Sequence, residues 1–459
     1  MKKRKVIIWS LVVALGGFLF GFDTAVISGA EKSIQQYWNL SSAEHGLTVS
    51  IALIGTIFGA LFGSIPSDRF GRKKTLFLVA VLYLVASLGT ALAHNWYLFL
   101  LFRFLGGIGV GASSVTAPVY ISEISPAKKR GSLVALFQFN VVFGILISYF
   151  SNYLIGTSTE TSWRWMLGIQ AVPSLIFLLL VRLVPETPRW LILKGGKFEA
   201  AKSILQIINP QGYETDYNKI MKGHELVAEK RDSEKLFQRK YKFPVTLAIL
   251  FAVFNQVSGI NAIIYYAPRI FEMTGLGTKS SLLSTAGIGL VNFLFTLLAI
   301  RFIDKIGRRT LMLIGSFGLI LSLGMVARTF FVHDFENFTV VIGLLLFIAF
   351  FAFSQGAVIW VFIAEIFPNQ VRAKGQTLGS VTHWIMAAII AFIFPVLAER
   401  LGGGVTFLFF TVMMILQLLF VWKMMPETKG RSLEDIELTI ASGKKGDLKE
   451  DIETSILLH

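Results

Sequence analysis

The sequence predicts an all-α integral membrane protein with twelve transmembrane helices in two six-helix bundles, with short cytoplasmic helices between the halves. Hydrophobic residues make up 54% of the 459 residues and charged residues only 15%, which is too little charge to cover the surface of a soluble protein. The basic residues gather in short runs between long apolar stretches, and motifs of the first half return in the second half.

Each span is predicted from an apolar stretch of sufficient length, because a hydrocarbon core of about 30 Å takes roughly 20 residues of helix. The first stretch begins with basic residues, as a signal peptide does. However, its apolar run is long, it contains Asp23, and it has no small-residue cleavage site, so we interpret it as a retained helix. We expect helices at 6–29, 46–66, 76–94, 97–122, 133–156, 163–184, 244–271, 279–303, 310–332, 338–366, 375–398 and 404–424.

These spans divide the chain into four parts. We expect an N-terminal six-helix bundle at 1–184, a cytoplasmic linker at 185–243, a C-terminal six-helix bundle at 244–425 and a cytoplasmic tail at 426–459. The linker is rich in Lys, Glu, Asp and Gln, and apolar residues recur at helical spacing in 197–208. This pattern predicts amphipathic helices that lie under the membrane.

The charge of the chain is positive, since 43 Lys and Arg residues outnumber 28 Asp and Glu residues and give +15. The basic runs alternate with apolar spans and do not line a helix face with interleaved aromatics, which argues against a nucleic-acid partner. They follow the positive-inside rule and predict that both termini are cytoplasmic, in a plasma membrane or a bacterial inner membrane. The chain has no cysteine, and we expect no metal or cofactor.

Three motifs of the first half return in the second, roughly 240 residues further along. Loop orientation alone would repeat Lys and Arg, but not Gly and Pro. Parallel six-helix repeats are typical of transporters, whose binding site lies at the membrane midplane between the halves. The pairs are Asp68-Arg69-Phe70-Gly71-Arg72 with Asp304-Lys305-Ile306-Gly307-Arg308, Glu123-Ile124-Ser125-Pro126 with Glu365-Ile366-Phe367-Pro368, and Pro185-Glu186-Thr187 with Pro426-Glu427-Thr428.

The charged residues of these loops are candidates for ion pairs that hold the cytoplasmic side closed and release when it opens. We expect each loop aspartate to pair with an arginine or a helix terminus, and each glutamate to pair with the arginine seven residues later. The alternative is ordinary charge at the membrane interface. The candidates are Asp68, Arg72, Glu123 and Arg130 in the first half, and Asp304, Arg308, Glu365 and Arg372 in the second.

The duplicated loops resemble those of the major facilitator superfamily. Other motifs resemble its sugar porter branch, which includes bacterial sugar–proton symporters and facilitative glucose carriers: Arg103-Phe104-Leu105-Gly106-Gly107, Pro185-Glu186-Thr187-Pro188-Arg189-Trp190, Gln256-Val257-Ser258-Gly259-Ile260-Asn261 and Pro426-Glu427-Thr428-Lys429-Gly430. The resemblance covers about residues 8–435. It implies a carrier of a monosaccharide, hexose or pentose, that works by alternating access without a cofactor.

Amides inside membrane helices are rare, and their clustering marks a candidate substrate site. Each amide offers a donor and an acceptor, which suits sugar hydroxyls, while aromatic planes suit the apolar ring faces. The alternative is that the amides bond helix to helix as interfacial contacts. The polar candidates are Gln138, Asn255, Gln256, Asn261, Tyr265, Tyr266 and Asn292, and the aromatic ones are Phe20, Trp360 and Trp384.

The resemblance adds roles to this set. It implies that Gln138, Gln256, Asn261, Tyr265, Asn292 and Trp360 contact the sugar, and that Tyr266 is an outer gate residue. Asn255 stands where many relatives have Gln. His383 stands where relatives have Asn or Gln; it either bonds a sugar hydroxyl or packs against a neighbouring helix.

Asp23 lies well inside the first span, where an unpaired charge costs several kcal/mol, so it must pair or become protonated. Arg103 in the fourth span is the expected partner, and an aspartate that alternates between this pair and a neutral form carries a proton. The resemblance supports this role, since the symporters have Asp at this position and the facilitative carriers have Asn. The alternatives are a permanent ion pair and a passive sugar uniporter.

Two other classes are weaker. A sugar sensor that does not transport would be expected to have a long cytoplasmic tail, and the tail here is short. A membrane enzyme is not indicated, because no metal-ligand spacing, nucleophile elbow or phosphate loop is found on any span. We therefore expect the partners to be a monosaccharide, protons and membrane lipid, with a monomer sufficient for function.

Overall fold

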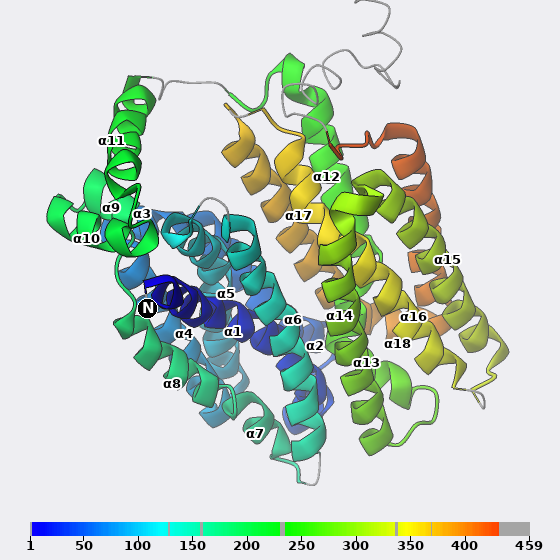
Figure 1. Cartoon of the computed structure of the whole chain (residues 1–459). Coiled ribbons are helices and arrows are strands. Elements are labelled where there is room, and N and C mark those ends of the chain that lie inside the picture. Colours follow the sequence, from blue (N-terminus) through cyan, green and yellow to red (C-terminus); the bar gives the residue numbers. More distant parts are fainter. Residues whose placement is uncertain are drawn as a thin grey trace, which may run out of the picture.

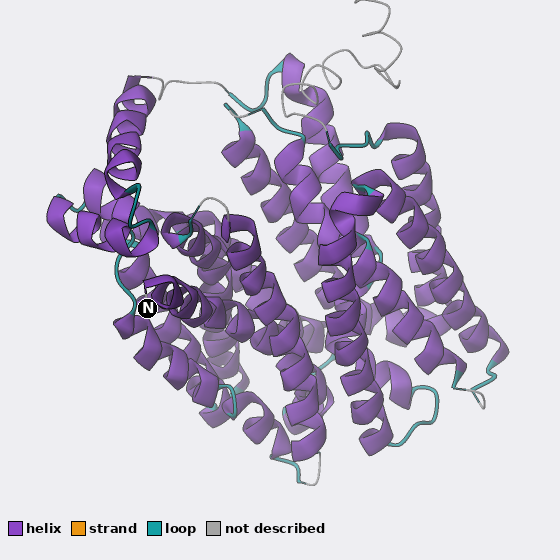
Figure 2. Ribbon diagram, viewed as in Figure 1, coloured by secondary structure: helices purple, strands orange, loops and turns teal. Residues whose placement is uncertain are grey.

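The computed structural model describes residues 2–126, 129–156, 159–229, 235–335, 338–368 and 370–430, and all regular structure in these residues is helical (Figure 2). The part of the predicted tail at 431–459 lies outside the described residues. Eleven of the described helical runs are long and apolar enough to cross a membrane.

The first half contains six of these runs. Its helices are α1 (Lys2–Tyr37), α2 (Ser42–Phe62), α3 (Ser64–Phe70), α4 (Arg72–Leu92), α5 (Trp96–Ile124), α6 (Arg130–Ile155), α7 (Ser162–Gly168) and α8 (Ala171–Leu180), the last two with η2 (Val181–Leu183) forming one span. Within this half α1 packs on α6, and α5 packs between α2 and α4.

The linker forms short helices, as the apolar spacing predicts. They are α9 (Pro188–Leu193), α10 (Phe198–Ile208), α11 (Tyr213–Glu229) and η3 (Arg239–Tyr241). Leu191 and Ile192 of α9 and Ala201 and Leu205 of α10 form a small buried cluster, separate from the cores of the bundles.

The second half repeats the arrangement. Its helices are α12 (Lys242–Val257), α13 (Ile260–Glu272), α14 (Thr278–Ile306), α15 (Arg308–Val332), α16 (Thr339–Phe353), α17 (Gln355–Glu365) and α18 (Arg372–Met424). The 53 residues of α18 are too long for one crossing, and Gly402 divides them with φ 77° and ψ 166°, which is not helical. The eleven runs thus supply twelve spans, and the predicted fold class is confirmed.

Two spans of this half are broken near the middle. The break between α12 and α13 falls at Gly259, whose φ of 87° favours glycine and whose added Cβ would lie 2.7 Å from the ring of Phe410. The break between α16 and α17 falls at Ser354. Irregular backbone is tolerated inside a membrane protein only where it is buried in protein or lines a polar cavity, so such breaks mark candidate sites.

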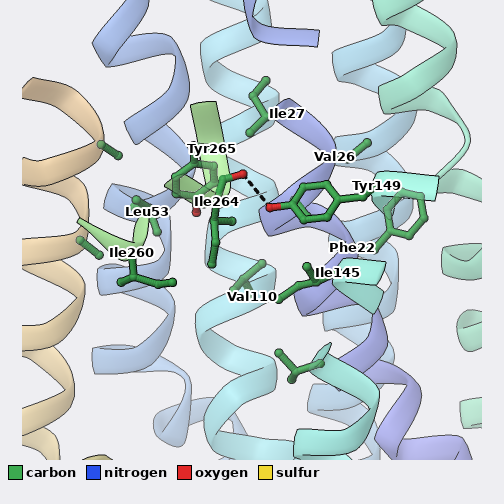
Figure 3. Packing of buried hydrophobic residues seen from close by; sticks show 14 of the residues in the cluster. Phe22, Val26, Ile27, Leu53, Val110, Ile145, Tyr149, Ile260, Ile264 and Tyr265 are labelled. Carbon is green, nitrogen blue, oxygen red and sulfur yellow. Dashed lines mark hydrogen bonds between the residues drawn. The ribbon is translucent and has the colours of Figure 1, made fainter. Parts of the chain in front are cut away.

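The two halves meet along α1 and α13, α6 and α14, and α2 and α18 (Figure 1). Figure 3 shows α13 packed among side chains of the first half, with the Tyr149 hydroxyl donating to the Ile264 carbonyl at 2.7 Å. Backbones approach closely where glycine is present: a Cβ on Gly46 would lie 2.1 Å from the carbonyl of Phe392.

We call the end of the bundles that carries α9, α10 and α11 the linker side, and the other end the opposite side. Toward the linker side the helices of the two halves spread apart (Figure 1). On the opposite side, by contrast, side chains of the two halves bond to each other: Lys32 to Glu272, Arg269 to Glu31 and Gln35, and Ser42 to Glu399.

Candidate functional site

A hydrogen-bonded network of amides lies at the break between α12 and α13. The Gln256 side chain is 1% exposed; its Nε2 donates to Asn255 Oδ1 at 3.0 Å, and its Oε1 accepts from Asn261 Nδ2 at 2.7 Å. Gln256 Nε2 also lies 3.2 Å from the ring nitrogens of His383 on α18. Four of the predicted residues are therefore in contact, and the Nδ2 of Asn255 has no bond among the described residues. Such a network offers a ring hydroxyl several donors and acceptors.

Three aromatic side chains border this network. The ring centroids of His383 and Trp360 are 4.9 Å apart, and those of His383 and Trp384 are 5.0 Å apart. Phe20, from the first half, lies 5.7 Å from Trp384. The aromatic planes predicted for the sugar ring are therefore brought together, Trp360 and Trp384 against His383 and Phe20 of the first half against Trp384. Trp360 is 38% exposed, so its face remains accessible.

Gln138 and Asn292 lie apart from the network. Gln138 is a half-buried residue of α6, and no hydrogen bond joins it to another described residue. Asn292 of α14 has one long hydrogen bond, in which its Oδ1 accepts from the Thr296 hydroxyl of the same helix at 3.5 Å. Both helices border the seam between the halves. Both amides are consequently free to bind a ligand, and neither serves as an interhelical contact in this structure.

Asp23 and Arg103 form a buried ion pair between α1 and α5, with Oδ1 and Nη1 3.0 Å apart and both residues less than 5% exposed. Two guanidinium nitrogens of Arg103, Nε and Nη2, have no partner among the described residues. A buried cation with spare donors stabilises a negative aspartate, and becomes costly when that aspartate is neutral.

Two tyrosines follow the amide network on α13. Tyr265 is 2% exposed, lies one helical turn beyond Asn261 on α13, and is close enough to Asp23 and Arg103 of the first half for their charges to act on its hydroxyl. Tyr266 is fully buried, has non-helical φ and ψ, and donates its hydroxyl to the Ala391 carbonyl at 2.9 Å. It lies on the opposite-side portion of the seam, next to His45.

The duplicated loops form two matching clusters, one in each half. In the first, Arg72 bonds to Glu123 (Nη2 to Oε1, 3.1 Å) and to Asp68 (Nη1 to Oδ1, 3.1 Å). In the second, Arg308 bonds to Glu365 (Nη2 to Oε1, 2.8 Å) and to Asp304 (Nη1 to Oδ1, 2.9 Å). Each cluster lies within one half, and it is formed although the helices spread apart on this side.

The expected pairing of each glutamate with the arginine seven residues later, which was predicted for a closed cytoplasmic side, is not formed in this structure, where the helices spread apart on the linker side. Arg130 donates to the Ser122 carbonyl at 3.2 Å, and Arg372 to the Phe367 carbonyl at 3.2 Å. Ser122 belongs to the last turn of α5, whose carbonyls have no partner within the helix, and Phe367 lies just beyond the end of α17, so each arginine satisfies a backbone carbonyl near a helix end. Glu123 and Glu365 pair instead with Arg72 and Arg308, the arginines that follow Gly71 and Gly307.

The repeated Pro-Glu-Thr motif completes these clusters, a role that the sequence did not reveal. The Glu186 carboxylate accepts from the backbone N–H groups of Arg72 and Lys73, both at 3.0 Å, and therefore binds the free amides at the start of α4. Burial raises the pKa of Glu186, and these backbone bonds oppose the shift. Glu427 binds Arg308 and Arg309 in the same manner, at 2.9 and 3.0 Å.

A cluster of ionisable side chains on the opposite side was not predicted from the sequence. Glu31, His45 and Arg269 are contributed by α1, α2 and α13 and contact one another there. None of them belongs to a repeated motif or to the amide set, and their separation along the chain hides the contact. The one available signal was an acidic residue near the end of an apolar helix.

Twelve apolar spans in two repeated halves, with a polar and aromatic site at the seam, define a multi-pass membrane transporter. The family model for "Sugar (and other) transporter" matches residues 9–439. The chain is 39% identical to the putative metabolite transport protein YwtG of Bacillus subtilis, over 95% of both chains, and 37% identical to the arabinose-proton symporter of the same organism, over 94% of both.

Solved structures agree with this assignment. The partially occluded inward open conformation of the xylose transporter XylE from E. coli is similar with a TM-score of 0.83 at 33% identity, covering 94% of this chain and 100% of that one. The chain belongs to the sugar transporter family and is a sugar porter of the major facilitator superfamily.

Proposed function

We propose that this protein is a proton-coupled monosaccharide symporter that works by alternating access, with its linker side in the cytoplasm. The basic loops at 69–74 and 305–309 lie on the linker side, in keeping with the positive-inside rule. A monomer within the lipid bilayer is sufficient, since the site lies between the halves of one chain. Under this proposal the state described above is inward-facing, and the amide network is the sugar site.

The observation that carries the proposal is the buried Asp23–Arg103 pair beside Tyr265. An aspartate in such surroundings is stable either as an ion pair or as a neutral acid, so its protonation is linked to where Arg103 lies. Because Tyr265 follows the amide network on α13, a sugar that moves this helix would also move the environment of the proton site. The name of the arabinose-proton symporter, to which the chain is similar, supports the same class.

Passive sugar transport is the second candidate. It is favoured if the pair stays formed throughout the cycle, which its short 3.0 Å contact and low exposure permit. In that case Asp23 would contribute to packing only, and no proton would move with the sugar.

Replacement of Asp23 by Asn separates the two. Asn is a near-isosteric mimic of the protonated acid, so sugar binding and the movement of the halves are retained while the linkage to the proton is lost. We expect D23N proteoliposomes to show no sugar accumulation under an imposed pH gradient, but sugar–sugar counterflow close to that of the wild type. Wild-type protein that equilibrates labelled sugar and never concentrates it would identify a uniporter.

A screen of glucose, galactose, xylose, arabinose and fructose, by their effect on the melting temperature, tests the substrate class, because a ligand that binds the folded protein raises its stability. The amide set accommodates a hexose or a pentose, which differ by one CH2OH group. Uptake of the sugar that binds, into proteoliposomes, distinguishes a carrier from a sensor.

A further inference from the structure

An ionic contact on the opposite side connects the two halves. Arg269 of α13 binds Glu31 of α1 through two nitrogens: Nε lies 3.1 Å from Oε1, and Nη2 lies 3.1 Å from Oε2. Gln35 accepts a further bond from the same guanidinium. This contact can exist only while the opposite side is closed, because α1 and α13 belong to different halves.

His45 of α2 adds a second nitrogen base to the same carboxylate. Its Nε2 lies 2.6 Å from Glu31 Oε2, and the imidazole is 0% exposed while Glu31 is 1% exposed. The Nε2–Oε2 contact is an ion-pair distance without hydrogen-bond geometry, and the Nδ1 of His45 likewise has no hydrogen-bond partner among the described residues. A proton added there would be buried beside Arg269 without an acceptor, so the neutral imidazole suits the closed arrangement.

The other charged side chains near His45 bond to groups other than its imidazole. Lys32 binds Glu272, and Glu399 of α18 accepts from Ser42 at the start of α2. Tyr266 of α13, whose ring centroid is 5.8 Å from that of His45, donates its hydroxyl to Ala391. Glu44, next to His45 on α2, accepts from Ser41. The carboxylate that faces His45 is therefore that of Glu31, and the nearest competing cation is Arg269.

A water-accessible route to this group is present. A cavity of about 650 Å³ lies on the opposite side, and Glu31 and Arg269 line it together with Lys32, Glu272, Tyr37 and Glu160. A cavity of this volume, lined by several charged groups, is large and polar enough to hold water, and it brings solvent up to the residue that carries the carboxylate.

We propose that Glu31 and His45 form a second proton-binding site, which takes up a proton when the opposite side opens and releases it when Arg269 returns. Both residues belong to the first half and stay together when α13 withdraws. The Glu31 carboxylate then loses its arginine, and an imidazolium at 2.6 Å replaces the missing positive charge. Protonation therefore favours the state that is open on the opposite side, and the equilibrium between the states depends on pH.

This site is distinct from the Asp23–Arg103 pair. Asp23 lies eight residues before Glu31 on α1, a rise of about 12 Å along the helix. The pH dependence expected here does not require Asp23 to titrate or sugar to be transported. It is therefore tested in a background that lacks the Asp23 carboxylate.

The test measures distances between spin labels in the D23N protein in nanodiscs. The chain has no cysteine, so labels attach only to introduced ones, here at Leu92 and Leu401, two exposed residues at the opposite-side ends of α4 and of the first part of α18. On acidification from about pH 7.5 to about pH 5.5, we expect the long-distance population to grow. The ratio of the two populations changes by at most about tenfold per pH unit, since one proton is linked to the transition.

The D23N/H45Q protein should lose this pH response, while D23N/H94Q, which removes an exposed histidine on the same side, should keep it. D23N/E31Q should also lose the pH response, because the imidazole then has no carboxylate to hold its proton. If the H45Q protein does not fold, the E31Q variant serves as the test. An unchanged pH response in folded D23N/H45Q or D23N/E31Q protein would overturn the proposal.

Discussion

Gln256 is the residue on which the candidate sugar site depends most. Its amide group contacts two other amides, of Asn255 and Asn261, and the imidazole of His383, and these contacts connect the broken span of α12 and α13 to α18. A bound sugar would exchange some of these contacts for its own hydroxyls. The net free energy of each exchange is small, and the loss is large only where a polar group is left without a partner.

The substitution Q256A should weaken sugar binding by about 1–3 kcal/mol, because hydroxyls and the neighbouring amides lose their partner inside the protein. Calorimetric titration of the purified protein measures this loss. Q170A is the matched control, since Gln170 is equally buried, lies at the junction of α7 and α8, and has an Nε2 without a described partner. Equal affinity in Q256A and wild type would exclude Gln256 from the site.

The residues of the site were predictable from the sequence to different degrees. Buried amides such as Asn261 are rare in membrane helices, so their chemistry and the family motif together indicate them. The contact of Gln256 with His383 was not predictable, because 127 residues separate them and no periodic pattern relates the two. The same holds for Glu31 with His45 and Arg269, whose proximity depends on which state the two halves adopt.

At the scale of the elements, the duplicated motif has one physical task in both halves. Gly71 and Gly307 have φ of 100° and 102°, and each leads into a helix whose first N–H groups bind the Glu186 or Glu427 carboxylate. A Cβ on Gly307 would lie 2.6 Å from Glu427 Oε2. The glycine is thus required both by the backbone conformation and by the approach of the carboxylate.

We expect G307A to lower the stability of the folded protein by about 1–3 kcal/mol, because alanine at this φ is strained and its methyl group displaces the Glu427 carboxylate. The apparent melting temperature of purified protein measures the effect. The control is G131A, at a position in α6 where nothing lies within 4 Å of the added Cβ; its melting temperature should be equal or slightly higher. Equal losses in both variants would contradict this account.

The elements themselves were largely predictable, since the length of an apolar run is set by the membrane. The predicted span at 279–303 corresponds to Thr278–Ile306, and the span at 310–332 to Arg308–Val332. The breaks at Gly259 and Ser354 were not predicted, because hydropathy averaged over a whole span does not mark them, although polar residues flank both, Gln256 and Ser258 before Gly259 and Gln355 after Ser354. They are fixed by tertiary contacts, such as that of Gly259 with Phe410.

At the scale of the whole molecule, the balance between the two open states depends on contacts that cross the seam. The loop clusters of Arg72 and Arg308 each lie within one half, so they fix the helix ends of that half in the state described here. On the opposite side, Arg269 bonds to two residues of the other half, Glu31 and Gln35. Loss of such a contact destabilises only the state in which the halves touch there.

The substitution R269Q should therefore shift the population toward the state open on the opposite side. Its physical reason is that the buried Glu31 carboxylate loses a partner that exists only in the closed arrangement. The Arg269 side chain is 21% exposed, so the cost in that state stays below the about 3–5 kcal/mol of a fully buried pair. Labels at Leu92 and Leu401 should move apart. Labels at Lys74 and Thr310, two exposed residues at equivalent linker-side positions of the two halves, should approach each other.

The control is R164Q, which removes a guanidinium on the same side. Arg164 bonds to the Ala91 and Ala93 carbonyls of its own half, at 2.8 and 2.7 Å, so its loss affects both states alike and should leave both label distances at their wild-type values. If R269Q leaves the distances unchanged, or if R164Q shifts them equally, the ionic contact across the seam does not set the balance between the states. If only the Leu92–Leu401 distance changes in R269Q, the two sides open independently, and the protein does not move as two rigid halves.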